Sequence, residues 1–247
     1  MTSSHEQDGH LPRVAAIVLA GGSGTRFGGG ANKVYLPLAG EHLITWSLRA
    51  MAALPGLVRL VLVIRDEDRA MARALLDAEP APVAVDLVDG GATRHESEYH
   101  ALRTLAPAVA AGAVEVVVIH DGARPLPSPG LVRAVVDTAA RQGGAVPGIP
   151  AGDLVEVADD ATVRRRLGTD HVRVQTPQAF AAGPLLAAYD AAAADGFTGT
   201  DTSACVQRYS QASVRWVPGE VDNIKVTLPA DLAQAEAIIR RRSDRPD

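Results

Sequence analysis

The chain has 247 residues, of which 47% are hydrophobic and 21% charged, and its net charge is -5. These proportions are typical of a globular protein and exclude a disordered chain, and the negative charge argues against nucleic acid or an anionic membrane as a partner. No apolar run reaches the ~18 residues that cross a bilayer, and the lone cysteine, Cys205, cannot form an intrachain disulfide, so we expect a cytoplasmic protein.

Short apolar runs alternate with segments of helical spacing over the first 150 residues or so. The predicted strands are residues 14–19, 57–64, 83–88, 115–119 and 144–149. The predicted helices are residues 43–54, 66–78, 94–105 and 128–141. This alternation predicts an α/β fold with a parallel sheet covered on both faces. Ligands of such sheets bind at the carboxyl ends of the strands, where this sequence places Gly21-Gly22, Asp89-Gly90-Gly91 and Asp121-Gly122.

The second half of the chain departs from this alternation. Residues 151–174 hold short alternating segments, which predict a β-hairpin or arm that leaves the main sheet. Further along, the predicted elements are helices at 184–194 and 203–209, a strand at 214–217 and a last helix at 231–242. Because no repeat or linker interrupts the chain, residues 12–247 are predicted to form a single domain with this arm, and residues 1–11 a disordered tail.

The segment LAGGSGTR at residues 19–26 is a glycine loop after the first strand, and Lys33 follows it. Backbone N–H groups of such a loop come close to phosphate oxygens, and Arg26 and Lys33 add positive charge. Phe27 stands where a dinucleotide fingerprint needs glycine, and the neighbours of Lys33 do not form a Walker A sequence. A plain glycine turn with exposed charges is the alternative.

Five further motifs follow in a fixed order: DGGATRHES at 89–97, HDGARP at 120–125, QTPQ at 175–178, TD at 200–201 and NIKVT at 223–227. With the glycine loop, they resemble the 2-C-methyl-D-erythritol 4-phosphate cytidylyltransferases, of which the ribitol 5-phosphate cytidylyltransferases are close relatives. The resemblance implies a three-layer Rossmann-like nucleotidyltransferase fold with a mostly parallel sheet and a protruding β-arm. It also implies transfer of CMP from CTP to a polyol phosphate, with Mg²⁺ as the cofactor.

The resemblance assigns roles to individual residues. The residues implied to be catalytic are Arg26, Lys33 and Lys225. Those implied to bind the nucleotide are Ala20, Gly21, Gly22, Gly24, Gly91, Ser97 and Asp121. The polyol phosphate would contact Arg124, Thr176 and Lys225. Asp121 would also hold Mg²⁺, which usually takes one or two carboxylates plus substrate phosphates, and Asp222 is a weaker candidate.

The implied reaction needs no nucleophilic side chain, because an acceptor phosphate oxygen attacks the α-phosphorus of CTP in line and pyrophosphate leaves. Catalysis then depends on positioning and on stabilising charge at the phosphate oxygens. Of the 24 basic residues only Lys33 and Lys225 are lysines. Lysine is a compact point charge that arginine does not replace, so we expect both to serve this task.

The resemblance weakens at the arm. The family usually has a threonine and an arginine that bind the acceptor at positions where this chain has Leu154 and Gly168, although residues 164–166 are all arginine. The leading interpretation is methylerythritol phosphate as acceptor. Ribitol 5-phosphate or another polyol phosphate is the alternative, and a catalytically silent nucleotide-binding protein is a third. In the family the arm is exchanged between subunits, which implies a homodimer.

Overall fold

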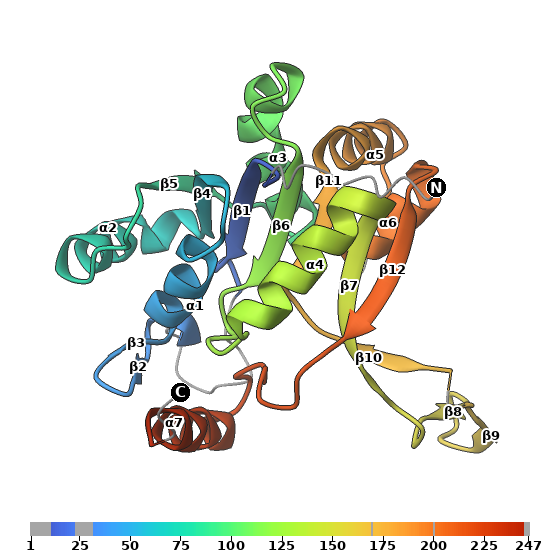
Figure 1. The fold of residues 1–247 in the computed structure, drawn as a ribbon. Helices are drawn as coiled ribbons and strands as arrows, with labels where there is room; N and C mark the ends of the chain where they lie inside the picture. Colours follow the sequence, from blue (N-terminus) through green and yellow to red (C-terminus); the bar gives the residue numbers. More distant parts are fainter. Residues whose placement is uncertain (1–10, 23–31, 169, 200, 245–247) are drawn as a thin grey trace, which may run out of the picture.

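The computed structural model describes residues 11–22, 32–168, 170–199 and 201–244. An eight-stranded sheet forms its centre, in the order β10-β7-β11-β6-β1-β4-β5 with β12 paired to β7 (Figure 1). The strands are β1 Val14–Leu19, β4 Leu57–Ile64, β5 Val85–Asp89, β6 Val116–Asp121, β7 Gly143–Pro150, β10 Val172–Val174, β11 Gln178–Ala181 and β12 Ser213–Pro218. β1 runs parallel to β4 and β6, whereas β11 is antiparallel to β6 and β7. The predicted mostly parallel sheet is confirmed.

Helices cover both faces of this sheet (Figure 1). One face carries α1 Leu43–Ala52, α2 Arg69–Ala78, α4 Pro129–Gln142 and α7 Pro229–Ser243. The other carries α3 Arg94–Ala110, α5 Ala182–Ala194 and α6 Thr202–Tyr209. None of the described helices is both long and apolar enough to cross a membrane. The three-layer α/β fold is confirmed.

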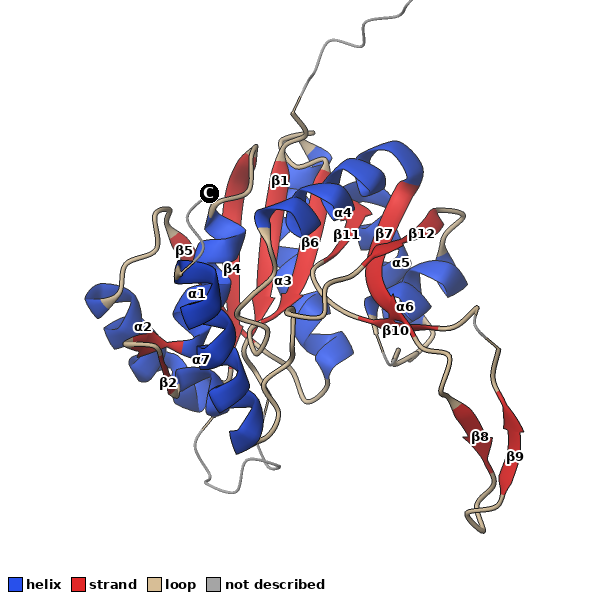
Figure 2. Cartoon of the chain, turned by 60° about the horizontal axis from the view of Figure 1, so that its bottom comes forward, coloured by secondary structure: helices blue, strands red, loops and turns tan. Residues whose placement is uncertain are grey.

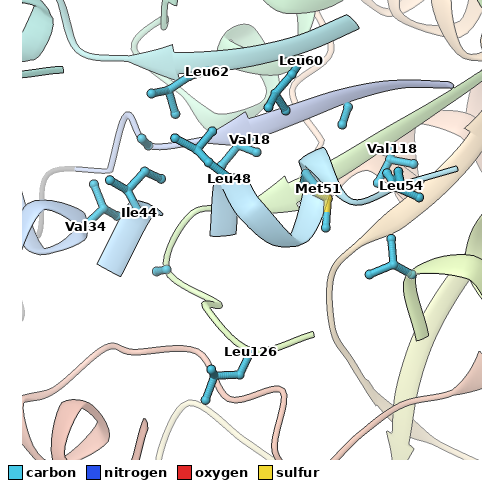
Figure 3. Packing of buried hydrophobic residues seen from close by; sticks show 14 of the residues in the cluster. Val18, Val34, Ile44, Leu48, Met51, Leu54, Leu60, Leu62, Val118 and Leu126 are labelled. Carbon is cyan, nitrogen blue, oxygen red and sulfur yellow. The ribbon is translucent and has the colours of Figure 1, made fainter. Parts of the chain in front are cut away.

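Strand β1 shows why its sequence is a continuous apolar run. Ala16 and Val18 belong to the hydrophobic layer that includes α1, where Figure 3 shows Val18 near Leu48. The alternate residues Ala15 and Ile17 belong to the layer on the opposite face. Successive side chains of a strand point to opposite faces, so a central strand that is covered on both sides needs an apolar residue at every position.

Short elements lie around this core. They are the 3-10 helices η2 Lys33–Tyr35 and η3 Asp66–Asp68, the strand pair β2 Pro37–Leu38 and β3 Glu41–His42, and the strand pair β8 Val155–Val157 and β9 Val163–Arg166. The β8–β9 hairpin projects from the body of the molecule (Figure 2). Among the described residues these two strands pair only with each other, as expected for an arm.

Three predictions about local structure were wrong. The helix expected to end at residue 105 continues to Ala110 with Pro107 inside it, because Ala108 and Val109 pack against the core and this tertiary contact outweighs the missing N–H of proline. Residues 172–174, assigned to the arm, form β10 of the main sheet. Gln178, for which no strand was predicted, begins β11, a four-residue strand held by pairing with β6 and β7 on both sides.

Smaller differences concern element ends. The segment predicted as one helix over residues 66–78 divides into η3 and α2, and other boundaries differ by one to a few residues. Strands β1 and β4 have the predicted bounds.

Burial of Cys205 leads to a test of the core. Its side chain is fully buried, and burial raises the pKa of the thiol to about 11, with the negative charge of Glu98 adding to the effect. We expect Ellman's reagent at pH 8 to label the native protein at least about a hundredfold more slowly than the protein in 6 M guanidinium, because the thiolate is the reactive form. Rapid labelling of the native protein would contradict this packing.

Candidate active site

A cavity of about 410 Å³ lies where the loops after β1, β5 and β6 meet. Eight of the residues expected from the sequence line it: Ala20, Gly21, Gly22, Lys33, Gly91, Ser97, Asp121 and Lys225. Arg124 and Thr176 are not among its lining residues. Gly24 and Arg26 lie outside the described residues. The expected convergence of the three glycine-containing loops is therefore confirmed.

Asn32 fixes the segment that carries Lys33. Its buried side-chain amide donates to the carbonyl oxygen of Ala20 at 2.6 Å and to Oδ2 of Asp68 at 3.0 Å. Arg65 holds the same carboxylate with two hydrogen bonds, at 2.7 and 2.8 Å. The start of η2 is thus attached to the end of β1 and to η3. The role of Asn32 was not predicted, although the residue stands immediately before Lys33 in the sequence.

Ser97 shapes the loop after β5. Its Oγ accepts from the Gly91 N–H at 3.0 Å and donates to the Thr93 carbonyl at 2.8 Å. A Cβ at Gly90 would come within 2.9 Å of this oxygen and 3.3 Å of the Ile64 carbonyl, so the close approach requires glycine. Thr93 caps α3 by accepting from the Glu96 N–H at 3.1 Å. These bonds present the backbone of the loop to the cavity in one conformation.

Asp121, the last residue of β6, is a buried carboxylate with three basic side chains around it. Lys225 Nζ lies 2.8 Å from its Oδ2, Arg94 binds its Oδ1, and Arg124 Nε lies 3.8 Å from Oδ2. Burial raises the pKa of Asp121, but the charges of Arg94 and Lys225 outweigh it and hold the pKa well below its ordinary value. The carboxylate is therefore ionised at neutral pH. Arg94 lies within a motif quoted above, but no role was predicted for it.

Lys225 reaches Asp121 because hydrogen bonds to neighbouring segments fix the loop that carries it. The N–H of Val226 donates to the carbonyl of Ala123 at 2.8 Å. Arg124 donates to the Asn223 carbonyl at 2.7 Å, and the Asn223 amide donates to the Thr176 carbonyl at 2.8 Å. Three motifs that are far apart in the sequence therefore meet beneath the cavity.

Lys33 faces the same C-terminal segment. Burial raises the pKa of Asp231, but hydrogen bonds from Thr227 and Leu228 and, as a smaller effect, the positive charge of Lys33 lower it below its ordinary value. Asp231 lies in the first turn of α7. Both lysines of the chain thus lie where the segment after β1 meets residues 223–231.

Thr176 and His120 support Asp121 rather than line the cavity. The Thr176 hydroxyl oxygen accepts from the Asp121 N–H at 3.0 Å and lies 3.2 Å from His120 Nδ1. His120 Nε2 lies 2.8 Å from the Arg124 carbonyl, to which it donates. Burial lowers the pKa of His120 to about 4, so the ring is neutral and its Nδ1 accepts from the threonine.

The hydroxyl of Thr176 can be tested directly. Thr176→Val keeps the shape but leaves the buried Asp121 N–H and His120 Nδ1 without this partner, so we expect the free energy of unfolding to fall by roughly 1–3 kcal/mol. Thr176→Ser should restore most of it. Thr104→Val is the control, because that hydroxyl is exposed and bonds only within its own helix. Urea unfolding measures all three, and equal losses for Thr176→Val and Thr104→Val would contradict the assigned role.

Comparison with known proteins agrees with this geometry. Residues 14–241 match the family model described as 2-C-methyl-D-erythritol 4-phosphate cytidylyltransferase. Proteins of that name from Pelotomaculum thermopropionicum and Cereibacter sphaeroides are 37% and 40% identical to this chain, over 95% and 91% of it and 98% and 96% of their own lengths.

Solved structures are similar over the same extent. The 4-diphosphocytidyl-2C-methyl-D-erythritol synthase of Anaerococcus prevotii has a TM-score of 0.78 at 26% identity, covering 93% of this chain and 96% of its own. The 2-C-methyl-D-erythritol 4-phosphate cytidylyltransferase of Thermus thermophilus has a TM-score of 0.70 at 29% identity, covering 91% and 98%. By its sequence and its fold, the chain belongs to the 2-C-methyl-D-erythritol 4-phosphate cytidylyltransferase family.

Proposed function

We propose that this protein transfers CMP from CTP to 2-C-methyl-D-erythritol 4-phosphate and releases pyrophosphate, as a step of non-mevalonate isoprenoid synthesis. The observation that carries the proposal is that Lys33, Lys225 and the ionised Asp121 line one cavity with the glycine loops. We further propose that the enzyme acts in the cytoplasm, and that residues 12–247 work as one domain with the arm.

The residues of the cavity divide the task. Backbone groups of Ala20, Gly21 and Gly22, with those of Gly91, hold the nucleotide, in keeping with anion binding by glycine loops. Lys33 and Lys225 supply fixed positive charge to the phosphate oxygens as the acceptor oxygen attacks and pyrophosphate departs. Gly24 and Arg26, from the same loop, complete this phosphate site in the proposal.

Arg124 and Thr176 affect the acceptor indirectly, by fixing backbone segments next to Lys225 and Asp121. Arg124 fixes the backbone at Asn223, two residues before Lys225, and Thr176 fixes the backbone of Asp121. A displacement of either would move a charge that faces the substrates. We therefore propose that these two residues position the acceptor site from beneath.

The site suits Mg²⁺ with Asp121 as its protein ligand. No cluster of three or more metal-binding side chains occurs among the described residues, and Mg²⁺ usually needs only one or two carboxylates plus substrate phosphates and water. The Asp121 carboxylate faces the cavity and is ionised. When bound, the ion would neutralise charge on the triphosphate. Asp222 fits less well, since it is not among the residues that line the cavity.

The arm supports a homodimer as part of this proposal. Its valines Val155, Val157 and Val163 are 38%, 50% and 58% exposed, and the β8–β9 hairpin pairs with no other described strand. An isolated two-stranded hairpin is marginally stable in water, and exposed apolar strand edges favour pairing with another chain. We infer that the arm packs against a second copy.

Pyrophosphate release tests the function. With CTP and Mg²⁺, methylerythritol 4-phosphate should be turned over and ribitol 5-phosphate should not. Lys33→Ala should lower kcat by roughly 10²–10³, because a fixed donor to the developing charge is lost. The control is Arg59→Ala, which removes an exposed cation paired with Asp86 at the far edge of the sheet.

Other outcomes of the pyrophosphate assay would favour the alternative functions or contradict the role of Lys33. Turnover of ribitol 5-phosphate alone would identify the alternative acceptor and tie it to the substitutions at Leu154 and Gly168. CTP binding without turnover of either acceptor would favour the catalytically silent protein. Full activity of Lys33→Ala would contradict the proposed role of that lysine.

The dimer has its own test. Val157→Lys with Val163→Lys should convert the dimer to a monomer in light scattering, because two charges would be buried in the interface. Met71→Lys is the matched control, since Met71 is 52% exposed on α2 at the other side of the molecule from the arm (Figure 1). A wild-type monomer, or a double variant with unchanged mass, would refute the arm as the interface.

A further inference from the structure

A second buried carboxylate, Glu98, contacts Arg94 on the side away from Asp121. Glu98 of α3 has no exposed surface. The Tyr189 hydroxyl of α5 donates to its Oε2, and the Thr202 hydroxyl of α6 donates to its Oε1 at 3.0 Å. Arg94 Nε lies 2.9 Å from Oε1, one helical turn away on the same helix, in an ion pair whose geometry is not that of a hydrogen bond. Three separate groups therefore surround one carboxylate inside the protein.

Arg94 connects this carboxylate to the cavity. While its Nε faces Glu98, its terminal nitrogen binds Asp121 Oδ1. Burial lowers the pKa of Arg94, but the two carboxylates outweigh it, so the pKa is raised and the guanidinium stays charged. The planar guanidinium thus lies between two carboxylates, in an ion pair with Glu98 at one edge and hydrogen-bonded to Asp121 at the other.

The need to hold α3 against α5 does not by itself explain why a carboxylate is buried at Glu98. Removing a carboxylate from water is costly, and a buried ion pair can often be replaced by apolar residues without loss of stability. The same two helices already have a polar link near the surface, where the Tyr99 hydroxyl donates to Asp190 at 2.9 Å. The feature that distinguishes Glu98 is that its ion-pair partner lines the cavity.

We propose that Glu98 is a positioning residue for CMP transfer: held by Tyr189 and Thr202, it fixes Arg94, and Arg94 orients the Asp121 carboxylate so that its Oδ2 meets Lys225. The inference rests on the proposed function for its effect on turnover. It does not require Glu98 to touch a substrate. Since Thr202 begins α6, the same network ties that helix to the cavity.

Two hydroxyls of the α3–α5 interface give a matched comparison. Tyr189→Phe removes one donor to Glu98 and keeps the ring that stacks on His95 with centroids 4.5 Å apart. Tyr99→Phe removes the equivalent donor to Asp190. We expect Tyr189→Phe to lower kcat and kcat/KM together by about three- to tenfold, as for a lost transition-state interaction, and Tyr99→Phe to change neither by more than about twofold.

A double-mutant cycle tests the route through Arg94. Glu98→Gln should lower kcat by roughly ten- to a hundredfold in the wild-type background, and by less than about twofold when Arg94→Gln is already present. A purely structural Glu98 would give losses that multiply. Slow labelling of Cys205 shows that each variant keeps its core. Should Glu98→Gln fail to fold, the tyrosine comparison decides the question.

A readout without turnover separates this inference from the proposed function. The terminal guanidinium N–H groups of Arg94, one of which binds Asp121, are assigned in NMR spectra by their loss in Arg94→Lys; they should exchange with water at least tenfold faster in Glu98→Gln and Tyr189→Phe than in the wild type. Unchanged exchange, or wild-type kcat in both variants, would overturn the inference. A wild type that turns over neither acceptor would overturn the proposed function, and the exchange rates would still show whether Glu98 fixes Arg94.

Discussion

The buried carboxylate of Asp121 sets the main constraint on this structure. A charge at the end of a central strand is very unfavourable unless positive groups surround it, and here those groups come from α3 and from the loop before α7. The chain must therefore bring its C-terminal segment back to the middle of the sheet. Thr176, Asn223 and Arg124 fix that return by hydrogen bonds to backbone atoms. The contacts that neutralise Asp121 therefore also hold the C-terminal segment against the sheet.

The parts of the fold that follow from local pattern could be predicted from the sequence. Strands β1 and β4 are apolar at almost every position because both of their faces are covered, and their bounds matched the structure. The glycine loops were placed together because carboxyl ends of parallel strands share one edge of a sheet, and the family resemblance added both lysines to them. Strand β11 could not be predicted, since four residues carry too little periodicity and its pairing partners are distant in sequence.

The residues that orient the site could not be predicted either, because their partners are also distant in sequence. Glu98 has the appearance of an ordinary polar residue on a helix, and its hydroxyl partners are 91 and 104 positions away. Asn32 and Arg94 stood within or beside recognised motifs, yet only three-dimensional contacts show that one holds the glycine loop and the other spans two carboxylates. Sequence motifs therefore identified the groups that line the cavity better than those that orient them.

The attachment of the arm has an evolutionary consequence. The chain leaves the sheet at the end of β7 and returns in β10, where Val172 pairs with Pro150. Everything between these two positions is an insert whose ends are fixed side by side on the sheet. Residues 151–171 can therefore change in length and sequence while the strands that carry the nucleotide loops keep their register. On this architecture the hairpin and the cavity are separable parts of the chain, because none of the described residues that line the cavity lies in the insert.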